Sequence, residues 1–453
     1  MKKFPVPAKI KKMSSIFKDA GFSLYIVGGA VRDFLLGIKN HDYDLCTDAE
    51  PEQVMNLFAH VIPTGIKHGT VTVLFGSESY EVTTFRTESS YSDFRHPDKV
   101  SFVKSLEEDL SRRDFTINAF AADCTTGVII DLFDGFSDLK KGIVRAIGNP
   151  QERFKEDALR LMRLCRFCAK LDFLPDEKTL EESTNLSPLI INVSSERIFD
   201  ELQKTLMTDH PSRGISLMEI TGLLREILPE LAACREITQT KVNATDVFEH
   251  ILISIEAAAE HDYSLEVRLS LLLHDIGKVQ TMSINQYGIM RFHNHEVVGA
   301  ELARNILKRL KCSNYLIDTV SLLIENHMVR YTDNWTDGAI RRFINKVGKE
   351  NINSLFEVQW CDQIASEGRA KIDLYDRFIE RIKEVQKTAM TVKDLAITGN
   401  DLNNLGIPKS KIMGDILSKL LEMVLDYPSL NDREVLLKEA SLIYQNQAQS
   451  NKA

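Results

Sequence analysis

The hydrophobic pattern of the chain changes once, at Gly148-Asn149-Pro150, and this change limits the folds that the sequence allows. Before it, short apolar runs bounded by glycine and polar residues predict strands at 24–27, 43–45, 71–75, 80–85, 100–103 and 128–131. After it, apolar residues recur at helical spacing from Glu152 almost to Tyr444. We therefore expect an α/β head with a mixed sheet, followed by an all-α remainder.

The length and composition favour a large protein without structural disulfides. At 453 residues the chain exceeds what one hydrophobic core serves, so we expect about two to four domains. Its seven cysteines are scattered and odd in number, which suits free thiols in a reducing compartment. No stretch reaches the roughly 18 consecutive apolar residues of a spanning helix, so we expect a cytoplasmic protein without membrane contact.

The net charge of −9 does not exclude a nucleic-acid partner, because phosphate contact depends on the local field. Cations outnumber acidic residues between positions 140 and 170, where they are Lys140, Lys141, Arg145, Arg153, Lys155, Arg160, Arg163, Arg166 and Lys170. We expect an anion-binding surface in this stretch.

Asp42 and Asp44 lie two apart in a strand-like run, and the two-residue period of a strand puts both carboxylates on one face. Two such carboxylates repel each other unless cations lie between them, and oxygen ligands of this kind suit Mg²⁺. The pair is therefore a candidate site for two-metal phosphoryl or nucleotidyl transfer. Most isolated D-x-D pairs are solvated surface charges, so the surrounding residues decide between the two interpretations.

The surrounding residues favour phosphate chemistry. Gly28-Gly29 lies at a predicted strand-to-helix turn, where a phosphate can approach backbone amides, and Arg32 follows one turn into the helix. The chain lacks a G-x-x-x-x-G-K-[ST] loop, which excludes a P-loop NTPase. Glu81, in a separate predicted strand, is a candidate third carboxylate.

Asp157, Arg160, Arg163 and Arg166 recur every three residues, which predicts one polar stripe on an α-helix. The stripe is either a solvated, salt-bridged helix face or a surface against which a phosphate or base lies. The mutual repulsion of three arginines favours the second explanation.

Four motifs occur in order along the chain. They are Ile26-Val-Gly-Gly-Ala-Val-Arg-Asp33 with Asp42-Tyr-Asp44, the segment from Glu81 to Arg86, Arg112-Arg-Asp-Phe-Thr-Ile-Asn-Ala119, and the segment from Arg153 to Phe167. Together they resemble the class II tRNA nucleotidyltransferase and poly(A) polymerase family. The resemblance implies a polymerase-β-like head in which Asp42, Asp44 and Glu81 are catalytic and Gly29 and Arg32 bind the nucleotide.

The resemblance also implies roles for the later motifs. Arg113 would bind the triphosphate, in agreement with the fit of a guanidinium to phosphate. Asp157 and Arg160 would read the Watson–Crick edge of the base, while Arg163 and Arg166 hold the helix and the nucleotide. Cytosine and adenine share an amino donor beside a ring-nitrogen acceptor, so one pair of side chains can accept CTP and ATP and reject UTP and GTP.

Two parts of the motif region receive different expectations. For Asp114 and Asn118 we favour a helix cap and a scaffold polar group. Residues 86–97 form a polar segment with no pattern of regular structure, and this segment, with Arg86, Glu88, Tyr91, Asp93, Arg95 and Pro97, resembles the flexible loop of the family. Its presence favours full CCA addition over CC-only addition and leaves A-only addition open.

A second set of side chains lies in the helical part. It comprises His250, His274, Asp275, His295, His327 and Asp362. A single helical histidine is usually a satisfied core residue, but six ligand-type residues on successive helices suit Ni²⁺, Mn²⁺, Co²⁺, Fe²⁺ or Zn²⁺. The set resembles an HD-type phosphohydrolase domain, which some bacterial CCA-adding enzymes carry and which cleaves phosphomonoesters or 2′,3′-cyclic phosphates.

We therefore expect four parts: a nucleotidyltransferase head (1–140), a neck and body (141–235), an HD-type helical domain (236–370) and a tRNA-binding tail (371–453). The predicted activity is addition of C, C and A to the tRNA 3′ end from CTP and ATP. Three alternatives remain: an A-adding enzyme or poly(A) polymerase, an HD phosphohydrolase with an RNA-binding head, and a non-catalytic tRNA-binding protein.

Overall fold

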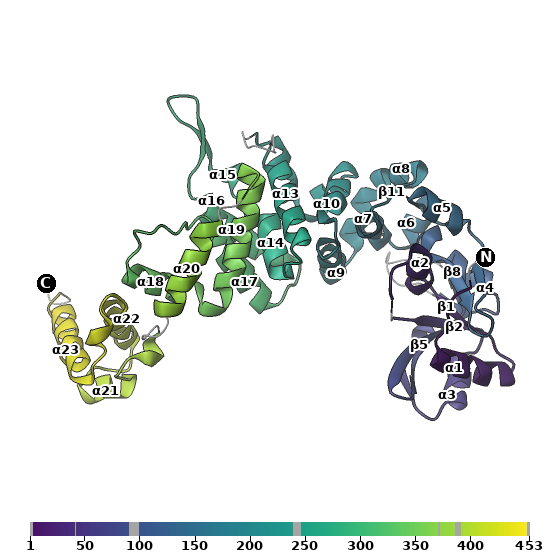
Figure 1. The fold of residues 1–453 in the computed structure, drawn as a ribbon, viewed down its shortest axis with the longest axis horizontal. Coiled ribbons are helices and arrows are strands. Elements are labelled where there is room, and N and C mark those ends of the chain that lie inside the picture. The colour runs from purple at the N-terminus through teal and green to yellow at the C-terminus, as the bar shows by residue number, and fades with distance from the viewer. Residues whose placement is uncertain are drawn as a thin grey trace. The chain divides into compact units, whose positions relative to one another are not determined.

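The computed structural model describes residues 3–40, 42–89, 99–238, 246–369, 372–385 and 391–450 (Figure 1). The chain forms two compact units, one of residues 1–233 with 309–312 and one of residues 234–308 with 313–453. The finer division into four domains stays a prediction. Among the described residues, no helix is both long and apolar enough to cross a membrane.

The first unit is built on a seven-stranded sheet with the order β3-β4-β5-β2-β1-β8-β9. Its strands are β1 (Leu24–Val27), β2 (Asp44–Thr47), β3 (Val61–Gly65), β4 (Thr70–Phe75), β5 (Glu78–Thr84), β8 (Phe120–Asp123) and β9 (Ile129–Asp131). Strands β2 and β5 pair in parallel and the other neighbours pair antiparallel, which confirms the predicted mixed sheet.

Apolar residues alternate between the two faces of this sheet, as the pleat requires. Ile26 and Leu45 lie in the core under helices α1 (Ala8–Asp19), α2 (Gly29–Leu36) and α3 (Pro51–Leu57). Val27 and Cys46 point to the opposite face, where they meet Phe85 and helix α4 (Leu106–Ser111). Because Asp44 lies two residues before Cys46 in β2, its side chain belongs to this second face.

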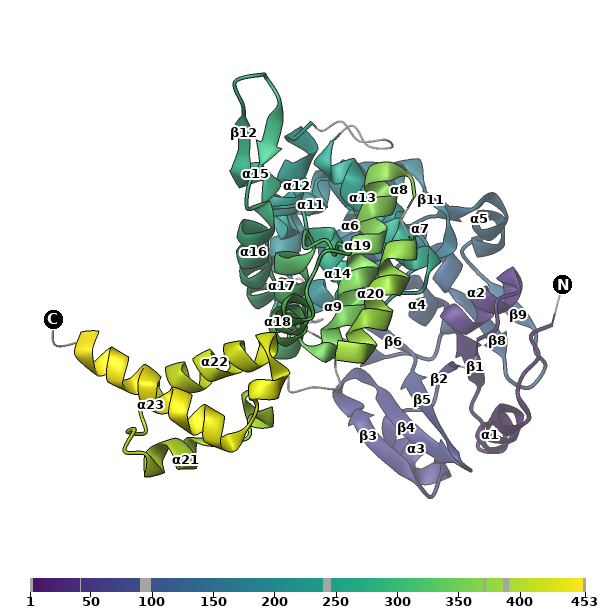
Figure 2. The ribbon, with the colours of Figure 1, turned by 60° about the vertical axis from the view of Figure 1, so that its left-hand side comes forward.

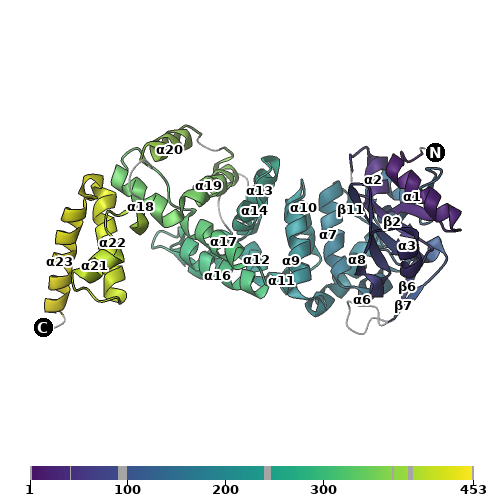
Figure 3. The same cartoon turned by 90° about the horizontal axis from the view of Figure 1, so that it is seen from below.

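Helices follow the sheet, as predicted. In the first unit they are α5 (Gly135–Lys141), α6 (Pro150–Glu156), α7 (Leu159–Leu171), α8 (Glu177–Leu186), α9 (Ser195–Leu206), α10 (Pro211–Ile220), α11 (Leu223–Ile227) and α12 (Pro229–Ala232). Helix α7 packs against both α9 and α10 (Figure 3). These contacts hold the arginine-bearing helix α7 against the rest of the unit.

In the second unit, α13 (Val247–Glu260), α14 (Leu265–Leu273), α17 (Asn314–Asn326) and α19 (Ile352–Glu367) pack together. The other helices are α15 (Lys278–Thr281), α16 (His295–Arg309), α18 (Asp337–Val347), α20 (Ile372–Val385), α21 (Gly399–Asn404), α22 (Lys411–Asp426) and α23 (Arg433–Ser450). The last three share a separate apolar core.

Three further strand pairs include five strands that were not predicted, whereas the strand predicted at 100–103 is present. Strands β6 (Arg86–Ser89) and β7 (Lys99–Phe102) form a hairpin, so Arg86 and Glu88 lie in regular structure, whereas Tyr91, Asp93, Arg95 and Pro97 fall outside the described residues. Strands β10 (Ile143–Val144) and β11 (Leu174–Pro175) pair in parallel, and β12 (Met282–Ile284) and β13 (Met290–Phe292) form a hairpin between α15 and α16 (Figure 2). Strands β10 to β13 have only two or three residues each, which is too few for the hydrophobic period to separate them from the surrounding helices.

Candidate functional site

Three carboxylates meet at the start of strand β2. The register pairs Leu45 with Val82, which sets Glu81 of β5 beside Asp44. Asp42 precedes the strand rather than lying in it, and its N–H donates to Asn40 Oδ1 at 2.8 Å. Burial raises the pKa of Asp44, and the carboxylates of Asp42 and Glu81 raise it further, while Arg113 lowers it. The predicted catalytic side chains therefore lie within one another's electrostatic field.

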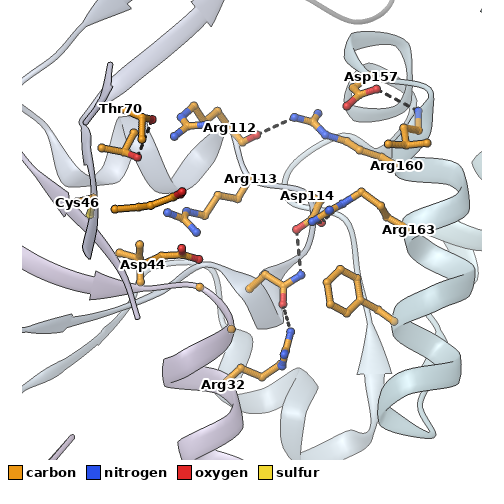
Figure 4. A pocket seen from close by; sticks show the side chains of 18 of the residues that line it. Arg32, Asp44, Cys46, Thr70, Arg112, Arg113, Asp114, Asp157, Arg160 and Arg163 are labelled. Carbon is orange, nitrogen blue, oxygen red and sulfur yellow. Dashed lines mark hydrogen bonds and ion pairs between the residues drawn. The ribbon is translucent and has the colours of Figure 1, made fainter. Parts of the chain in front are cut away.

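The Gly28 turn brings bare backbone next to this carboxylate group. Gly28 has a φ of 70°, and a Cβ placed on it would lie 3.1 Å from Arg113 Nη1 and 3.9 Å from Asp44 Oδ2. A side chain here would be both strained and crowded. Arg113 itself points toward Asp44 (Figure 4), and its buried Nε has no hydrogen-bond partner among the described residues. This buried donor is available to an anion.

Asp114 and Asn118 have a larger role than the expected cap and scaffold groups. Both are buried, and they form a chain of hydrogen bonds that joins helix α2 to helix α7 (Figure 4). Arg32 Nη1 donates to Asn118 Oδ1 at 2.5 Å, and Asn118 Nδ2 donates to Asp114 Oδ1 at 3.0 Å. Arg163 then donates to Asp114 Oδ2 from Nε at 2.8 Å and from Nη2 at 2.6 Å. The two residues thus hold Arg32 and Arg163, two predicted nucleotide-binding arginines, in position.

The charge on Asp114 is stabilised by this network. Burial alone would raise its pKa, but the Arg163 guanidinium and the Asn118 amide lower it to about 2. The Phe167 ring lies among three guanidinium groups, at 5.3 Å from Arg32, 5.4 Å from Arg163 and 4.3 Å from Arg166. Attraction between cations and the ring face helps to hold these arginines together.

Asp157 lies outside the helix that the sequence predicts for it. It ends α6 with an extended backbone, at a φ of −142° and a ψ of 104°, and α7 begins at Leu159. Its Oδ1 accepts from Leu159 N at 3.1 Å, and its Oδ2 accepts from Arg197 Nη2 at 2.8 Å. The Asp157 carboxylate thus accepts from the first residue of α7 with one oxygen and from Arg197 of helix α9 with the other.

Each arginine of the predicted stripe has an acidic partner. Arg160 pairs with Glu156, Arg163 with Asp114, and Arg166 with Glu201 at 2.6 Å. The repulsion between the arginines therefore does not by itself require a bound phosphate, and that part of the sequence argument was wrong. Two of these partners, Asp114 and Glu201, come from segments distant in sequence, so the pattern along the helix could not indicate them.

Arg197 and Glu201 of helix α9 were missed by sequence reasoning. They lie four residues apart, on one face of the helix, and contact Asp157 and Arg166 respectively. Their spacing is a common surface pattern, so only the contact with α7 distinguishes them.

These groups surround one cavity with a volume of about 640 Å³. Nine of the ten predicted head-site residues line it: Gly29, Arg32, Asp44, Glu81, Arg113, Asp157, Arg160, Arg163 and Arg166. Asp42 lies beside the cavity without lining it. One end of the cavity carries the carboxylates, and Asp157 and Arg160 lie across it on the helical side (Figure 4).

Comparison with known proteins agrees with this geometry. Residues 24–145 match the family model of the poly(A) polymerase head domain. Residues 172–235 match the model described as a probable RNA- and SrmB-binding site of polymerase A, and 295–440 match the model described as putative tRNA nucleotidyltransferase domain 2. The CCA-adding enzyme of Ligilactobacillus salivarius is 35% identical over 451 residues, which cover 96% of this chain and 97% of the relative. The chain belongs to the family of CCA-adding enzymes.

Other members of the CCA-adding family show similar coverage. The enzyme of Enterococcus faecalis is 35% identical over 452 residues and covers 97% of this chain and 98% of its own length. The crystal structure of the Bacillus stearothermophilus CCA-adding enzyme in complex with CTP aligns with a TM-score of 0.74, at 29% identity, over 100% of both chains. The similarity therefore extends over both compact units.

The second unit of this family member gathers the six predicted HD-type residues. His250 Nε2 lies 3.2 Å from His274 Nε2 and 3.0 Å from Asp362 Oδ1. Asp275 lies 3.3 Å from His274 Nε2 and 3.4 Å from His295 Nε2. His327 joins His274 and Asp275 in a group whose possible ligand atoms lie within 4.8 Å of one another.

The hydrogen bonds of these histidines fix which ring nitrogen faces the group. His274, His295 and His327 each direct Nδ1 at a backbone carbonyl, at 2.8, 2.8 and 2.6 Å respectively. A proton on each Nδ1 leaves the Nε2 lone pair free to bind a cation, as in known metal sites. The buried His295 Nε2 and His250 Nδ1 have no hydrogen-bond partner within the described part of the chain.

The protonation states also suit metal ligands. Burial lowers the pKa of His250, and it lowers that of His327 to about 4. Burial would raise the pKa of Asp362, but the hydrogen bond from His250 and the nearby His274 lower it well below its usual range. Burial would also lower the pKa of His274, but the carboxylate of Asp275 raises it above its ordinary value. Neutral His250 and His327 beside an ionised carboxylate have the forms that bind transition metals.

Proposed function

We propose that this chain adds C, C and A to the 3′ end of tRNA from CTP and ATP in the cytoplasm, with release of pyrophosphate. The observation that carries the proposal is the cavity itself. It brings carboxylates, an open glycine turn and an arginine cluster together with an Asp–Arg pair that can read a base. Family membership supports the same activity, because the relatives named above are CCA-adding enzymes and the similarity covers nearly their full length.

Asp42, Asp44 and Glu81 fit Mg²⁺. They are hard oxygen ligands, and burial together with the carboxylates of Asp42 and Glu81 makes it costly to keep Asp44 ionised, a cost that a divalent cation would relieve. Bound there, Mg²⁺ would lower the pKa of the attacking 3′ hydroxyl and neutralise charge on the triphosphate. Asp44 and Asp42 would hold the ions, and Glu81 would complete the acidic side of the cavity.

The nucleotide would lie with its triphosphate along the Gly29 amide, Arg32 and Arg113. Arg113 offers its unpartnered Nε, and Arg32 is held by Asn118. Arg163 and Arg166 would contact the nucleotide from the helical side. These groups are already oriented by hydrogen bonds, so binding requires little rearrangement.

Asp157 and Arg160 retain hydrogen-bonding capacity for a base. Arg160 donates hydrogen bonds to Arg112 O at 2.8 Å, to Arg153 O at 2.9 Å and to Glu156 Oε2 at 2.5 Å. These bonds occupy three of the five N–H donors of the guanidinium. Each oxygen of Asp157 accepts one hydrogen bond and keeps a further lone pair. A carboxylate acceptor beside a guanidinium donor matches the edges of cytosine and adenine.

The test is incorporation of labelled CTP and ATP, separately and together, into tRNA transcripts that lack their last three nucleotides. We expect two C and one A with Mg²⁺, and no incorporation by the variant with Asp42→Ala and Asp44→Ala. Incorporation of A alone would indicate an A-adding enzyme or polymerase, and unchanged activity of the variant would refute the metal site.

We propose a second activity, hydrolysis of phosphate esters by the second unit with Ni²⁺, Mn²⁺, Co²⁺ or Fe²⁺. The convergence of His250, His274, Asp275, His295, His327 and Asp362 supports it. Metal content after dialysis against each ion and hydrolysis of a phosphomonoester would test it. His274→Ala should lose both while retaining CCA addition, and His261→Ala should lose neither.

A further inference from the structure

A small cavity of about 200 Å³ adjoins the histidine group of the second unit. It shares His327, Arg330 and Asp362 with a larger cavity of about 630 Å³, into which Lys278 and Arg291 also face. The two cavities thus meet at the proposed metal ligands, and each has a different chemical character.

The small cavity has aromatic walls in fixed positions. Tyr331, Phe356 and Tyr375 line it. Tyr331 stacks on Phe378 with ring centroids 4.1 Å apart and an interplanar angle of 10°, and Phe356 meets Tyr375 edge to face at 5.5 Å. Flat walls of this kind bind flat rings, and stacking of a nucleobase on aromatic side chains is a common form of recognition.

Polar groups at the edge of the cavity match a base rather than a plain hydrocarbon ring. Gln359, which is 7% exposed, donates from Nε2 to Val329 O at 2.6 Å. This bond orients the amide, so its Oε1 can accept from an amino group of a ligand. Gln363 adds a second amide to the lining.

Arg330 occupies the junction of the two cavities. Within the described residues it makes no ion pair, and its charge lowers the pKa of Tyr375 against the larger effect of burial, so it lies close to the aromatic walls. Lys278 and Arg291 extend the cationic side in the larger cavity. A ligand with a base in the small cavity would direct its phosphate toward these cations.

We propose that the Tyr331–Phe356–Tyr375 cavity is a nucleoside-binding subsite, which holds the base of a nucleoside monophosphate while Arg330 binds its phosphate. This inference rests on the proposed phosphohydrolase activity only for the hydrolysis of the bound nucleotide's phosphate ester. Binding of the base depends on the cavity alone and needs no metal.

The chain provides its own reporter for this subsite. Its two tryptophans are Trp335, at 5.9 Å from the Tyr331 ring, and Trp360, at 6.2 Å from the Tyr375 ring. Neither belongs to the unit that holds the nucleotidyltransferase cavity. Tryptophan emission can be excited at the red edge of its absorption, where bases do not absorb. A change in this emission therefore reports binding in the second unit, because the nucleotidyltransferase cavity has no tryptophan in its own unit.

The experiment titrates the full chain, in the presence of a metal chelator, with adenosine 3′-monophosphate, with adenosine and with ribose 5-phosphate. We expect a saturable emission change with the first two and none with the third. Tyr375→Leu should weaken binding of both about fivefold or more, and Arg330→Ala should weaken the nucleotide about tenfold and leave adenosine unchanged. Tyr287→Leu, the same substitution at an exposed hairpin position, is the matched control and should bind normally.

No saturable change in the wild type, or equal weakening of nucleotide and nucleoside by Arg330→Ala, would overturn the proposal. Thermal melting of each variant separates loss of binding from loss of folding, and the exposed Arg330 is the variant that tests the site if Tyr375→Leu unfolds. Nucleotide binding without hydrolysis after metal is restored would leave the subsite standing and refute the phosphohydrolase.

Discussion

Replacing Asp114 by asparagine tests whether the arginines of the cavity are positioned by buried acidic partners. The substitution keeps the shape of the side chain and removes its charge. Asp114 and Arg163 are joined by two hydrogen bonds to one oxygen, with side-chain exposures of 6% and 33%. After the change, the remaining acidic partner of Arg163 is Glu201, at 3.6 Å.

The expected loss follows from this geometry. Breaking a buried ion pair by removing one partner costs about 3–5 kcal/mol. Because a third of the Arg163 side chain reaches solvent, we reduce this to about 2–3 kcal/mol. If the loss appears in the transition state, kcat/KM for CTP and ATP should fall about 30-fold to 150-fold.

The assay is steady-state addition of CTP and of ATP to transcripts ending in the appropriate nucleotide. Asp200→Asn is the matched control, because Asp200 forms an exposed pair with Lys204, with side-chain exposures of 51% and 49%, and such pairs contribute little. A decrease of less than threefold in kcat/KM for Asp114→Asn, with folding intact, would refute the positioning argument.

Three further changes have defined outcomes. Gly28→Ala should reduce nucleotide addition at least tenfold, measured as kcat/KM, because its Cβ would crowd Arg113 at a positive φ; full activity would show that the turn can adapt. Arg197→Met should weaken discrimination against UTP and GTP, measured as a ratio of kcat/KM values, because Asp157 loses one of its two hydrogen-bonded restraints; an unchanged ratio would contradict this role. Since the folded pKa of Asp114, about 2, lies below its ordinary value, its stabilisation is complete above about pH 5 and is lost as the pH falls toward 2. The difference in urea midpoint between wild type and Asp114→Asn should therefore shrink between pH 6 and pH 3, and a constant difference would argue against the ion pair.

Most of the residues that form the candidate sites could be predicted from the sequence, but most of the contacts between them could not. The glycine turn, the carboxylates and the arginines are short-range patterns, so their motifs indicated the contents of the cavity. The six HD-type residues are spread from His250 to Asp362, with only His274 and Asp275 adjacent, and they could be recognised by residue type. In both cases the chemistry of each side chain limits what it can do, whatever the distance along the chain.

The contacts that orient these groups could not be predicted, because they join segments far apart. Asp114, read as a cap, pairs with Arg163, and Asp157, placed on a helix, lies at the break between α6 and α7. The three-residue spacing of Asp157 and the arginines continues unchanged across the break between the two helices. The spacing therefore cannot show where the break lies. The β12–β13 hairpin and the β10–β11 pair were missed because two or three residues in a strand carry no detectable alternation.

The parallel pairing of β2 with β5 has a consequence for synthesis of the protein. Asp44 and Glu81 lie on these two strands, and the chain between them must first make α3, β3 and β4. Strand β1 lies between β2 and β8 in the sheet, and β8 is synthesised much later than β1. Closing such long loops is slow and costs entropy. A nascent chain on the ribosome thus carries Asp42 and Asp44 well before the sheet that positions them is complete, and the edge of β1 stays unpaired until β8 has been made.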